Sequence, residues 1–280
     1  MNATPLSDAE RCRRFAEDGV LLLPGFYDCA RDIEPVQRGI HSVIGEVMRR
    51  HGVPDRRSPF DPARFDEGFQ ELIAQDRSRG GEVYDAVKQI PAFVRLVAHP
   101  ANEALMRVLR PDCVPGLAGG GHGIRIDNPG DDRFRAHWHQ EYPAQLRSLD
   151  GAVFWSPLVP VTPELGPVAL CPGSHREGLQ PVRAESADGR AGAYALRLDR
   201  EHELIARHRR EAPLTRPGDL IVMDFLLLHA SGHNRARRSR WSMQFRYFNF
   251  AEPTGRAHGW KGSFAAGVDF RHVHPELCVD

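Results

Sequence analysis

The chain has 280 residues, of which 37 are basic and 37 acidic, so its formal net charge at neutral pH is zero. This balance removes the excess positive charge with which proteins attract nucleic acids or anionic lipid surfaces, and it favours a small-molecule partner. No apolar run approaches the length of a membrane-spanning helix, about 18 residues, and the polar start does not resemble a signal peptide. These two features favour a cytoplasmic protein. The oligomeric state is left open.

Helical signals begin at the start of the chain. Ser7 and Glu10 have the spacing of a capping box, and Gly19 is a typical stop residue, so a helix is predicted between them. A short apolar strand is expected directly afterwards, at residues 20–23.

The rest of the first part is also predicted to be mainly helical. Apolar residues recur at helical intervals from 33 to 48, and a loop rich in proline and aspartate follows at 53–66. Helical patterns resume at about 69–109, where Pro91 and Pro100 are expected to break them.

From about residue 111 onward the pattern changes to short apolar runs separated by glycine, proline and aspartate. Strands are predicted near 114–117, 122–127, 135–141, 151–156, 167–171, 219–224 and 241–250. Helices followed by strands, without βαβ alternation, indicate an α+β protein whose helices pack against a mainly β sandwich or barrel. We expect one domain over residues 1–280, with a helical part at about 1–110, a β core at about 111–252 and a C-terminal tail at 253–280.

The densest group of potential metal ligands is the segment from His137 to Glu141. Alternate residues of a strand share a face, so His139 and Glu141 would point the same way. His229 follows an apolar strand and precedes the hydroxyl of Ser231, and it is the third potential ligand. Two histidines and one carboxylate would leave three coordination positions open on iron(II). Taken singly, the first pair could equally be a solvated strand face and His229 a buried core histidine.

Arg240 lies eleven residues beyond His229, at the start of a predicted strand. One face of this strand is polar and the other apolar. The polar face carries Arg240, Ser242, Gln244 and Arg246. This face could be in contact with solvent, as antiparallel sheets often are, or Arg240 could lie inside a barrel and hold a carboxylate through two parallel hydrogen bonds.

Several motifs in a fixed order together resemble the phytanoyl-CoA dioxygenase family of iron(II)- and 2-oxoglutarate-dependent oxygenases. The motifs are His139-x-Glu141, the segment Cys171-Pro-Gly-Ser-His-Arg176, Pro217-Gly-Asp219, His229-x-Ser231-x-x-Asn234 and Arg240. The N-terminal segment from Phe15 to Gly25 is also similar. The resemblance implies a double-stranded β-helix with jelly-roll topology and N-terminal helices.

The resemblance also implies the roles of individual residues. His139, Glu141 and His229 would bind Fe(II), and Arg240 would form a salt bridge with 2-oxoglutarate, the co-substrate consumed with O2. Ser231 would support the same carboxylate. Trp155 would line the co-substrate pocket, and Arg125 and Asp127 would reach co-substrate or substrate. His175 would have a structural role in a turn.

Glu141 departs from the family pattern, because most members have aspartate at this position. Related halogenases have glycine or alanine there, so an acidic ligand favours hydroxylation or desaturation of an unactivated C–H bond in a small molecule, with release of succinate and CO2. The segments 53–66 and 176–192 and the C-terminal tail are the possible lids over the substrate. The sequence does not identify the substrate.

Two other functions use the same residue types. A cupin-like isomerase or epimerase would bind its metal through His137 and His139, but Glu141 lies too close to the second histidine for that pattern, which also gives Arg240 no role. A non-catalytic metal-binding module is the other alternative.

Overall fold

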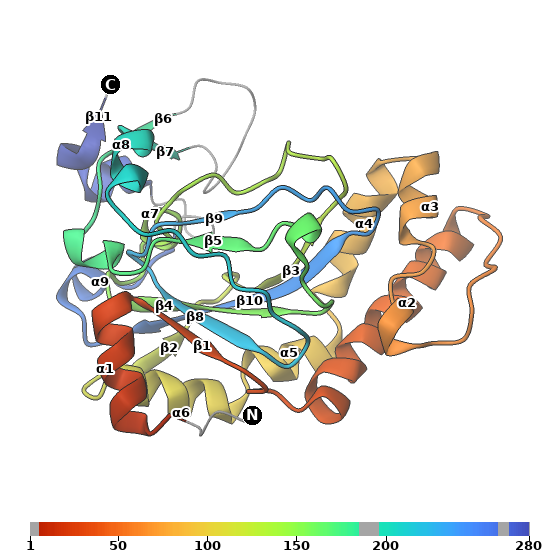
Figure 1. Cartoon of the computed structure of the whole chain (residues 1–280), viewed down its shortest axis with the longest axis horizontal. Helices are drawn as coiled ribbons and strands as arrows, with labels where there is room; N and C mark the ends of the chain where they lie inside the picture. The colour runs from red at the N-terminus through yellow and green to blue at the C-terminus, as the bar shows by residue number, and fades with distance from the viewer. Residues whose placement is uncertain (1–5, 185–195, 263–268, 280) are drawn as a thin grey trace.

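The computed structural model describes residues 6–184, 196–262 and 269–279. A six-stranded antiparallel sheet forms its centre, with helices against one face and smaller sheets on the other side (Figure 1). The predicted mixture of helices and antiparallel sheets is therefore confirmed. Among the described residues, no helix has the length and apolar character that crossing a membrane requires.

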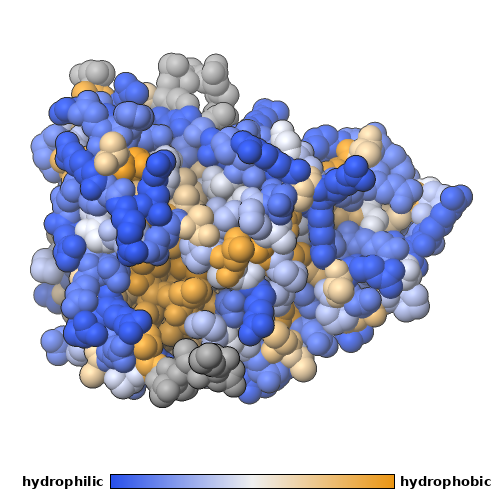
Figure 2. All heavy atoms as spheres, in the orientation of Figure 1, coloured by the Kyte–Doolittle hydropathy of each residue, from blue (hydrophilic) through white to orange (hydrophobic). Residues whose placement is uncertain are grey.

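The central sheet is organised around its longest strand, β10 (Arg240–Asn249). The strand order is β1 (Val20–Leu23), β8 (Leu220–Asp224), β4 (Gly151–Pro157), β10 and β2 (Pro115–Leu117). The strand β3 (Gly123–Asp127) also pairs with β10. It pairs with the first half of β10, whereas β2 pairs with the second half. Hydrophobic residues gather beside α1 and β1, on a face that is otherwise mainly hydrophilic (Figure 2).

The smaller sheets contain short strands. An antiparallel pair joins β5 (Val168–Leu170) to β9 (His229–Ser231). A three-stranded sheet contains β11 (Cys278–Val279), β6 (Val182–Ala184) and β7 (Leu196–Leu198), and its β11–β6 pairing is parallel. The sequence predicts β5, which lies in the apolar run at 167–171. It does not predict β6, β7, β9 or β11, which have two or three residues each, too few to establish an alternation of apolar residues.

The N-terminal elements follow their sequence signals closely. The helix α1 (Asp8–Asp18) begins after Ser7, whose hydroxyl accepts a hydrogen bond from the Glu10 N–H, and it ends at Gly19, where φ is +67°. The helices that follow are α2 (Glu34–Arg50), α3 (Phe69–Gln75), α4 (Ser78–Val87), α5 (Pro91–Val97) and α6 (Pro100–Leu109), with a π-helical turn η1 (Cys29–Ile33) before α2. The predicted breaks at Pro91 and Pro100 are confirmed, and each proline begins the next helix, because it lacks only an N–H that the first helical turn leaves unpaired.

The two faces of the central sheet have different partners. Phe154, Trp241 and Phe245 point toward the helices and belong to the larger apolar core. Trp155 and Met223 point to the other side and pack with the residues of β5. This alternation agrees with the predicted faces of β10 and leaves its polar face on the side of the smaller sheets.

The predicted strand at 135–141 is wrong. His139 forms only an isolated bridge with His229, and Glu141 has helical backbone angles (φ −73°, ψ −33°) at the start of α7 (Tyr142–Gln145). A helical turn ends a β ladder, so the alternation of side-chain directions along a strand does not decide how His139 and Glu141 point. The remaining short helices that the sequence did not predict are α8 (Glu201–Ala206), α9 (Pro253–Ala257) and α11 (Phe270–Val273).

Candidate active site

Two backbone hydrogen bonds bring the first potential ligands together. The His139 N–H donates to the His229 carbonyl at 3.0 Å, and the His229 N–H donates to the His139 carbonyl at 3.1 Å. Glu141 is positioned by a bond of 2.8 Å from its N–H to the carbonyl of Phe225, which directly follows β8. The three side chains therefore meet through this bridge and the first turn of α7 rather than through one strand.

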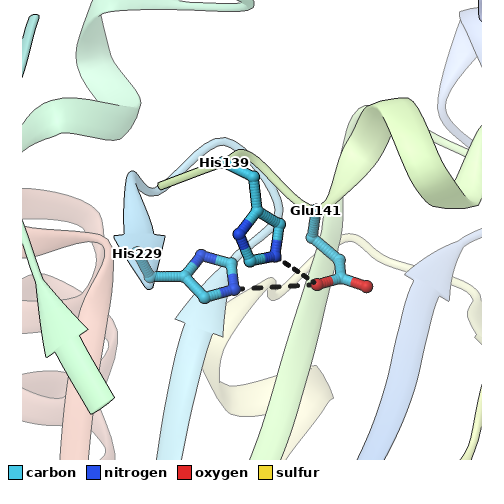
Figure 3. Close-up of side chains that lie close together, drawn as sticks. All are labelled: His139, Glu141 and His229. Carbon is cyan, nitrogen blue, oxygen red and sulfur yellow. Dashed lines mark ion pairs between the residues drawn. The ribbon is translucent and has the colours of Figure 1, made fainter. Parts of the chain in front are cut away.

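The side chains of His139, Glu141 and His229 form one compact group. Their potential ligand atoms all lie within 4.8 Å of one another. Both imidazoles point toward the same carboxylate oxygen (Figure 3), with Glu141 Oε2 at 3.8 Å from His139 Nε2 and at 3.7 Å from His229 Nε2. These separations leave space for an ion among the three atoms.

The opposite ring nitrogens set the tautomer of each histidine. Nδ1 of His139 lies 2.7 Å from the His137 carbonyl, and Nδ1 of His229 lies 2.9 Å from the Leu227 carbonyl. A carbonyl only accepts, so each Nδ1 carries the proton and each Nε2 presents a lone pair to the centre of the group. The donor set therefore fits a divalent transition metal. Among the described residues this group does not include His137, so the His137/His139 pair of the cupin-like alternative is not assembled.

The second oxygen of Glu141 is held by two donors. Oε1 accepts hydrogen bonds from Arg246 Nε at 2.9 Å and from Gln145 Nε2 at 3.2 Å. This division leaves Oε2 alone facing the histidines. The sequence does not predict either of these partners of Glu141. Two signals point to them: Arg246 lies on the polar face of its predicted strand, and Gln145 follows Glu141 at helical spacing.

The electrostatic environment favours the unprotonated ligand forms. Burial by itself would raise the pKa of Glu141, but the charge of Arg246 and the contacts of both histidines outweigh it and hold this pKa well below its usual range. Burial lowers the pKa of His229, and neighbouring His139 lowers it further. A metal binds a carboxylate and a neutral imidazole, so these shifts favour the metal-binding forms of Glu141 and His229.

Arg240 is completely buried at the start of β10, on the same face as Ser242 and Arg246. Its Nη2 donates to Asp127 Oδ2 at 2.8 Å. Its Nε and Nη1, and the hydroxyl of Ser242, have no hydrogen-bond partner among the described residues. Buried donors in this condition are costly unless an acceptor is supplied, and a carboxylate is an acceptor that suits a guanidinium.

The other predicted residues surround a small cavity of about 60 Å³ at the histidines. Trp155, Ser231 and Arg125 line it, together with the three potential ligands. Arg240 does not line this cavity. Asp127 is fully engaged between Arg125 and Arg240, and both cations hold its pKa down against the opposing effect of burial.

One possible lid packs on the helical side, and the other two lie only partly within the described residues. The segment 53–66 packs on the helical side, where Asp66 accepts a hydrogen bond from Trp241 Nε1 at 3.0 Å. Of the segment 176–192, residues 185–192 lie outside the described residues, as do 263–268 and 280 of the tail. The ring of His175 contacts the end of α1 through a bond of 3.1 Å between Nε2 and the Ala16 carbonyl.

Two imidazoles and one carboxylate are the ligand set typical of non-haem iron(II) oxygenases. Comparison with known proteins agrees with this class. The model of the phytanoyl-CoA dioxygenase family matches residues 15–242, and the chain belongs to this family.

Individual relatives support the same class. The ectoine dioxygenase of Sphingopyxis alaskensis is 25% identical over 253 residues, which cover 83% of this chain and 72% of that protein. The crystal structure of EctD from S. alaskensis with 2-oxoglutarate and 5-hydroxyectoine has a TM-score of 0.58 at 19% identity, covering 90% of this chain and 79% of that chain. The α-ketoglutarate-dependent epimerase SnoN of nogalamycin biosynthesis has a TM-score of 0.51 at 19% identity, covering 89% of this chain and 87% of that chain. The protein is thus an enzyme of the 2-oxoglutarate-dependent oxygenase class, and its structural neighbours carry out more than one reaction.

Proposed function

We propose that this protein is an Fe(II)- and 2-oxoglutarate-dependent dioxygenase that hydroxylates or desaturates an unactivated C–H bond of a small molecule and releases succinate and CO2. The observation that carries the proposal is the convergence of His139 Nε2 and His229 Nε2 on one oxygen of Glu141. The architecture supports a jelly-roll topology, with β5 and β9 as part of the second sheet of a single domain spanning the chain.

His139, Glu141 and His229 would hold the iron. Bound iron supplies the activation of O2 that accompanies oxidative decarboxylation of the keto acid. The protein keeps Oε2 of Glu141 directed at the ion by fixing Oε1 through Arg246 and Gln145. It orients both rings through the carbonyl partners of Nδ1.

Arg240 would bind the distal carboxylate of 2-oxoglutarate. Its Nε and Nη1 are free among the described residues, and Asp127 fixes the plane of the guanidinium through Nη2. Ser242 offers a further unpaired hydroxyl on the same face, and Ser231 of β9 lines the cavity at the histidines. The apolar side chains of Val153, Val168 and Met223 line the cavity and would limit the access of water.

The proposal is tested by anaerobic titration of the metal-free protein with iron(II) and 2-oxoglutarate. We expect the weak visible charge-transfer absorption of a chelated keto acid, and succinate formation once oxygen is admitted. His229→Ala removes a ligand and should abolish both signals, while far-ultraviolet circular dichroism shows that the fold is retained. Folded wild-type protein that gives no such absorption would overturn the proposal.

A further inference from the structure

Two larger cavities share lining residues with each other, and one of them reaches the metal-ligand group. One, of about 440 Å³, lies between α4 and β3, and we call it the outer cavity. The other, of about 480 Å³, reaches Glu141 and Arg246, and we call it the inner cavity. Arg125 lines both of them and the small cavity at the histidines, and Tyr84 lines both larger cavities. Their volumes are in the range of about 300–1,000 Å³ that is typical of small-molecule sites.

The outer cavity is lined by positive charge. Arg77, Arg125 and Arg133 line it, and no acidic side chain does so among the described residues. Arg77 and Arg125 have carboxylate partners, Asp131 and Asp127. Arg133 has no ion-pair partner among the described residues. Because the whole chain has no net charge, the arginines give the outer cavity a local excess of positive charge. A cleft with such an excess attracts anions.

Aromatic side chains border the same space. Phe134 is 57% exposed and Tyr84 is 42% exposed, although both are large and largely apolar. The guanidinium carbon of Arg133 lies 5.3 Å from the centre of the Phe134 ring, so cation and aromatic surface lie side by side. A ligand with both an anionic group and an apolar or aromatic body would use both features.

Glycines keep the cavities open. A Cβ atom on Gly81 of α4, or on Gly123 of β3, would meet no atom within 4 Å. The neighbouring Gly80 differs, because its Cβ would lie 2.9 Å from the side chains of Ile73 and Arg77. Packing does not require glycine at position 81, although glycine is less favourable than alanine inside a helix. Its effect is to leave room in the outer cavity, which Gly81 and Arg125 both line.

We propose that the outer and inner cavities together form the substrate site and that the substrate is a small organic anion, a carboxylate or phosphate monoester, with an apolar or aromatic body. This inference rests on the proposed function, because it places the reacting carbon at the Glu141 end of the inner cavity. The anionic group binds near Arg133, and the body lies along Tyr84 and Phe134.

The test uses matched probes and the full-length, metal-free protein in excess 2-oxoglutarate. Isothermal titration calorimetry compares 4-phenylbutyrate and 3-phenylpropyl phosphate with the neutral 4-phenylbutyramide. We expect both anions to bind at least about tenfold more tightly than the amide, since one charge-assisted hydrogen bond is worth about a factor of ten. The tighter of the two anions identifies the head group.

Variants locate the bound probe. Arg133→Gln should weaken anion binding about tenfold and Arg133→Lys much less. The matched control is Arg95→Gln, which changes an exposed arginine of α5 outside both cavities. Gly81→Leu should block binding without lowering the unfolding temperature, because its side chain enters open space.

The outcomes separate this inference from the proposed function. Equal affinity for the amide, or affinities unchanged by Arg133→Gln and Gly81→Leu, would overturn the inference even if the protein binds iron and 2-oxoglutarate. If anions bind through Arg133 but iron and 2-oxoglutarate do not bind, the anion site stands and the proposed function fails.

Discussion

At the scale of single residues, Glu141 divides its two oxygens between different partners. Oε1 takes the hydrogen bonds of Arg246 and Gln145, and Oε2 faces the two histidines. Glutamate has one more rotatable bond than aspartate, so these two donors restrict a side chain that would otherwise move more freely. The extra length of Glu141 is thus compensated by a defined set of contacts.

Replacing Arg246 should loosen this carboxylate. We expect Arg246→Met to weaken iron(II) binding about tenfold or more, the usual effect of removing a group that orients a metal ligand. Anaerobic titration of iron(II) measures the dissociation constant without any turnover. Arg246→Lys keeps the charge and should recover part of the affinity, and unchanged binding in both variants would contradict the assignment.

Arg240 should act on 2-oxoglutarate rather than on iron. In Arg240→Lys the single ammonium cannot replace two parallel donors, so we expect the KM for 2-oxoglutarate to rise about tenfold or more while iron(II) affinity is retained. Steady-state succinate assays give the KM. Arg238→Lys is the control, because Arg238 pairs with Asp66 on the helical side. Equal effects of the two substitutions would argue against a carboxylate at Arg240.

At the scale of elements, the junction of α1 and β1 depends on one glycine. Gly19 has φ +67°, and its Cβ would lie 2.4 Å from His175 Nδ1. Gly25 has a similar φ of +62°, but its Cβ would meet nothing within 4 Å. The two positions therefore separate backbone strain from a steric clash.

We expect Gly25→Ala to lower the free energy of unfolding by about 1–2 kcal/mol, the cost of a left-handed alanine. Gly19→Ala adds the displacement of His175 and should cost clearly more. Urea denaturation followed by circular dichroism measures both values. A Gly19 variant no less stable than the Gly25 variant would mean that His175 moves aside freely.

Elements with strong local signals are predictable from the sequence, including the short strands β1, β2 and β5, whereas β6, β7, β9 and β11 are not. The cap and stop of α1 and the two faces of β10 are strong local signals, and both predictions are confirmed. The alternating residue types around His139 predict a strand in this segment. Tertiary hydrogen bonds to His229 and Phe225 decide its backbone instead, and local sequence does not encode them. The same limit explains why the partners of Glu141 were not predicted.

At the scale of the whole molecule, Glu252 connects the C-terminal part to the central sheet. Its carboxylate caps α9 by accepting hydrogen bonds from the N–H groups of Thr254 and Gly255, and it also accepts one from Leu149, close to the start of β4. Burial would raise the pKa of Glu252, but these N–H donors outweigh it and lower the pKa.

A lowered pKa in the folded state gives a defined pH dependence. Glu252 stabilises the protein above its unfolded pKa of about 4.3, and this contribution is lost as the pH falls through the folded value. Glu252→Gln should therefore be less stable than wild type at pH 7, with the difference shrinking below about pH 4. Urea midpoints measured across this range test the sign. A difference that grows on acidification would refute it.

The bridge between His139 and His229 gives metal loading a mechanical consequence. A single β-bridge contains only two backbone hydrogen bonds, so by itself it is a weak connection between segments that are far apart in the sequence. An ion shared by the two rings would act as a reversible cross-link at this point and oppose local opening. The amide protons of these two residues should then exchange with deuterated solvent more slowly after loading with iron(II). Local exchange rates would thus report occupancy of the centre in the absence of any substrate.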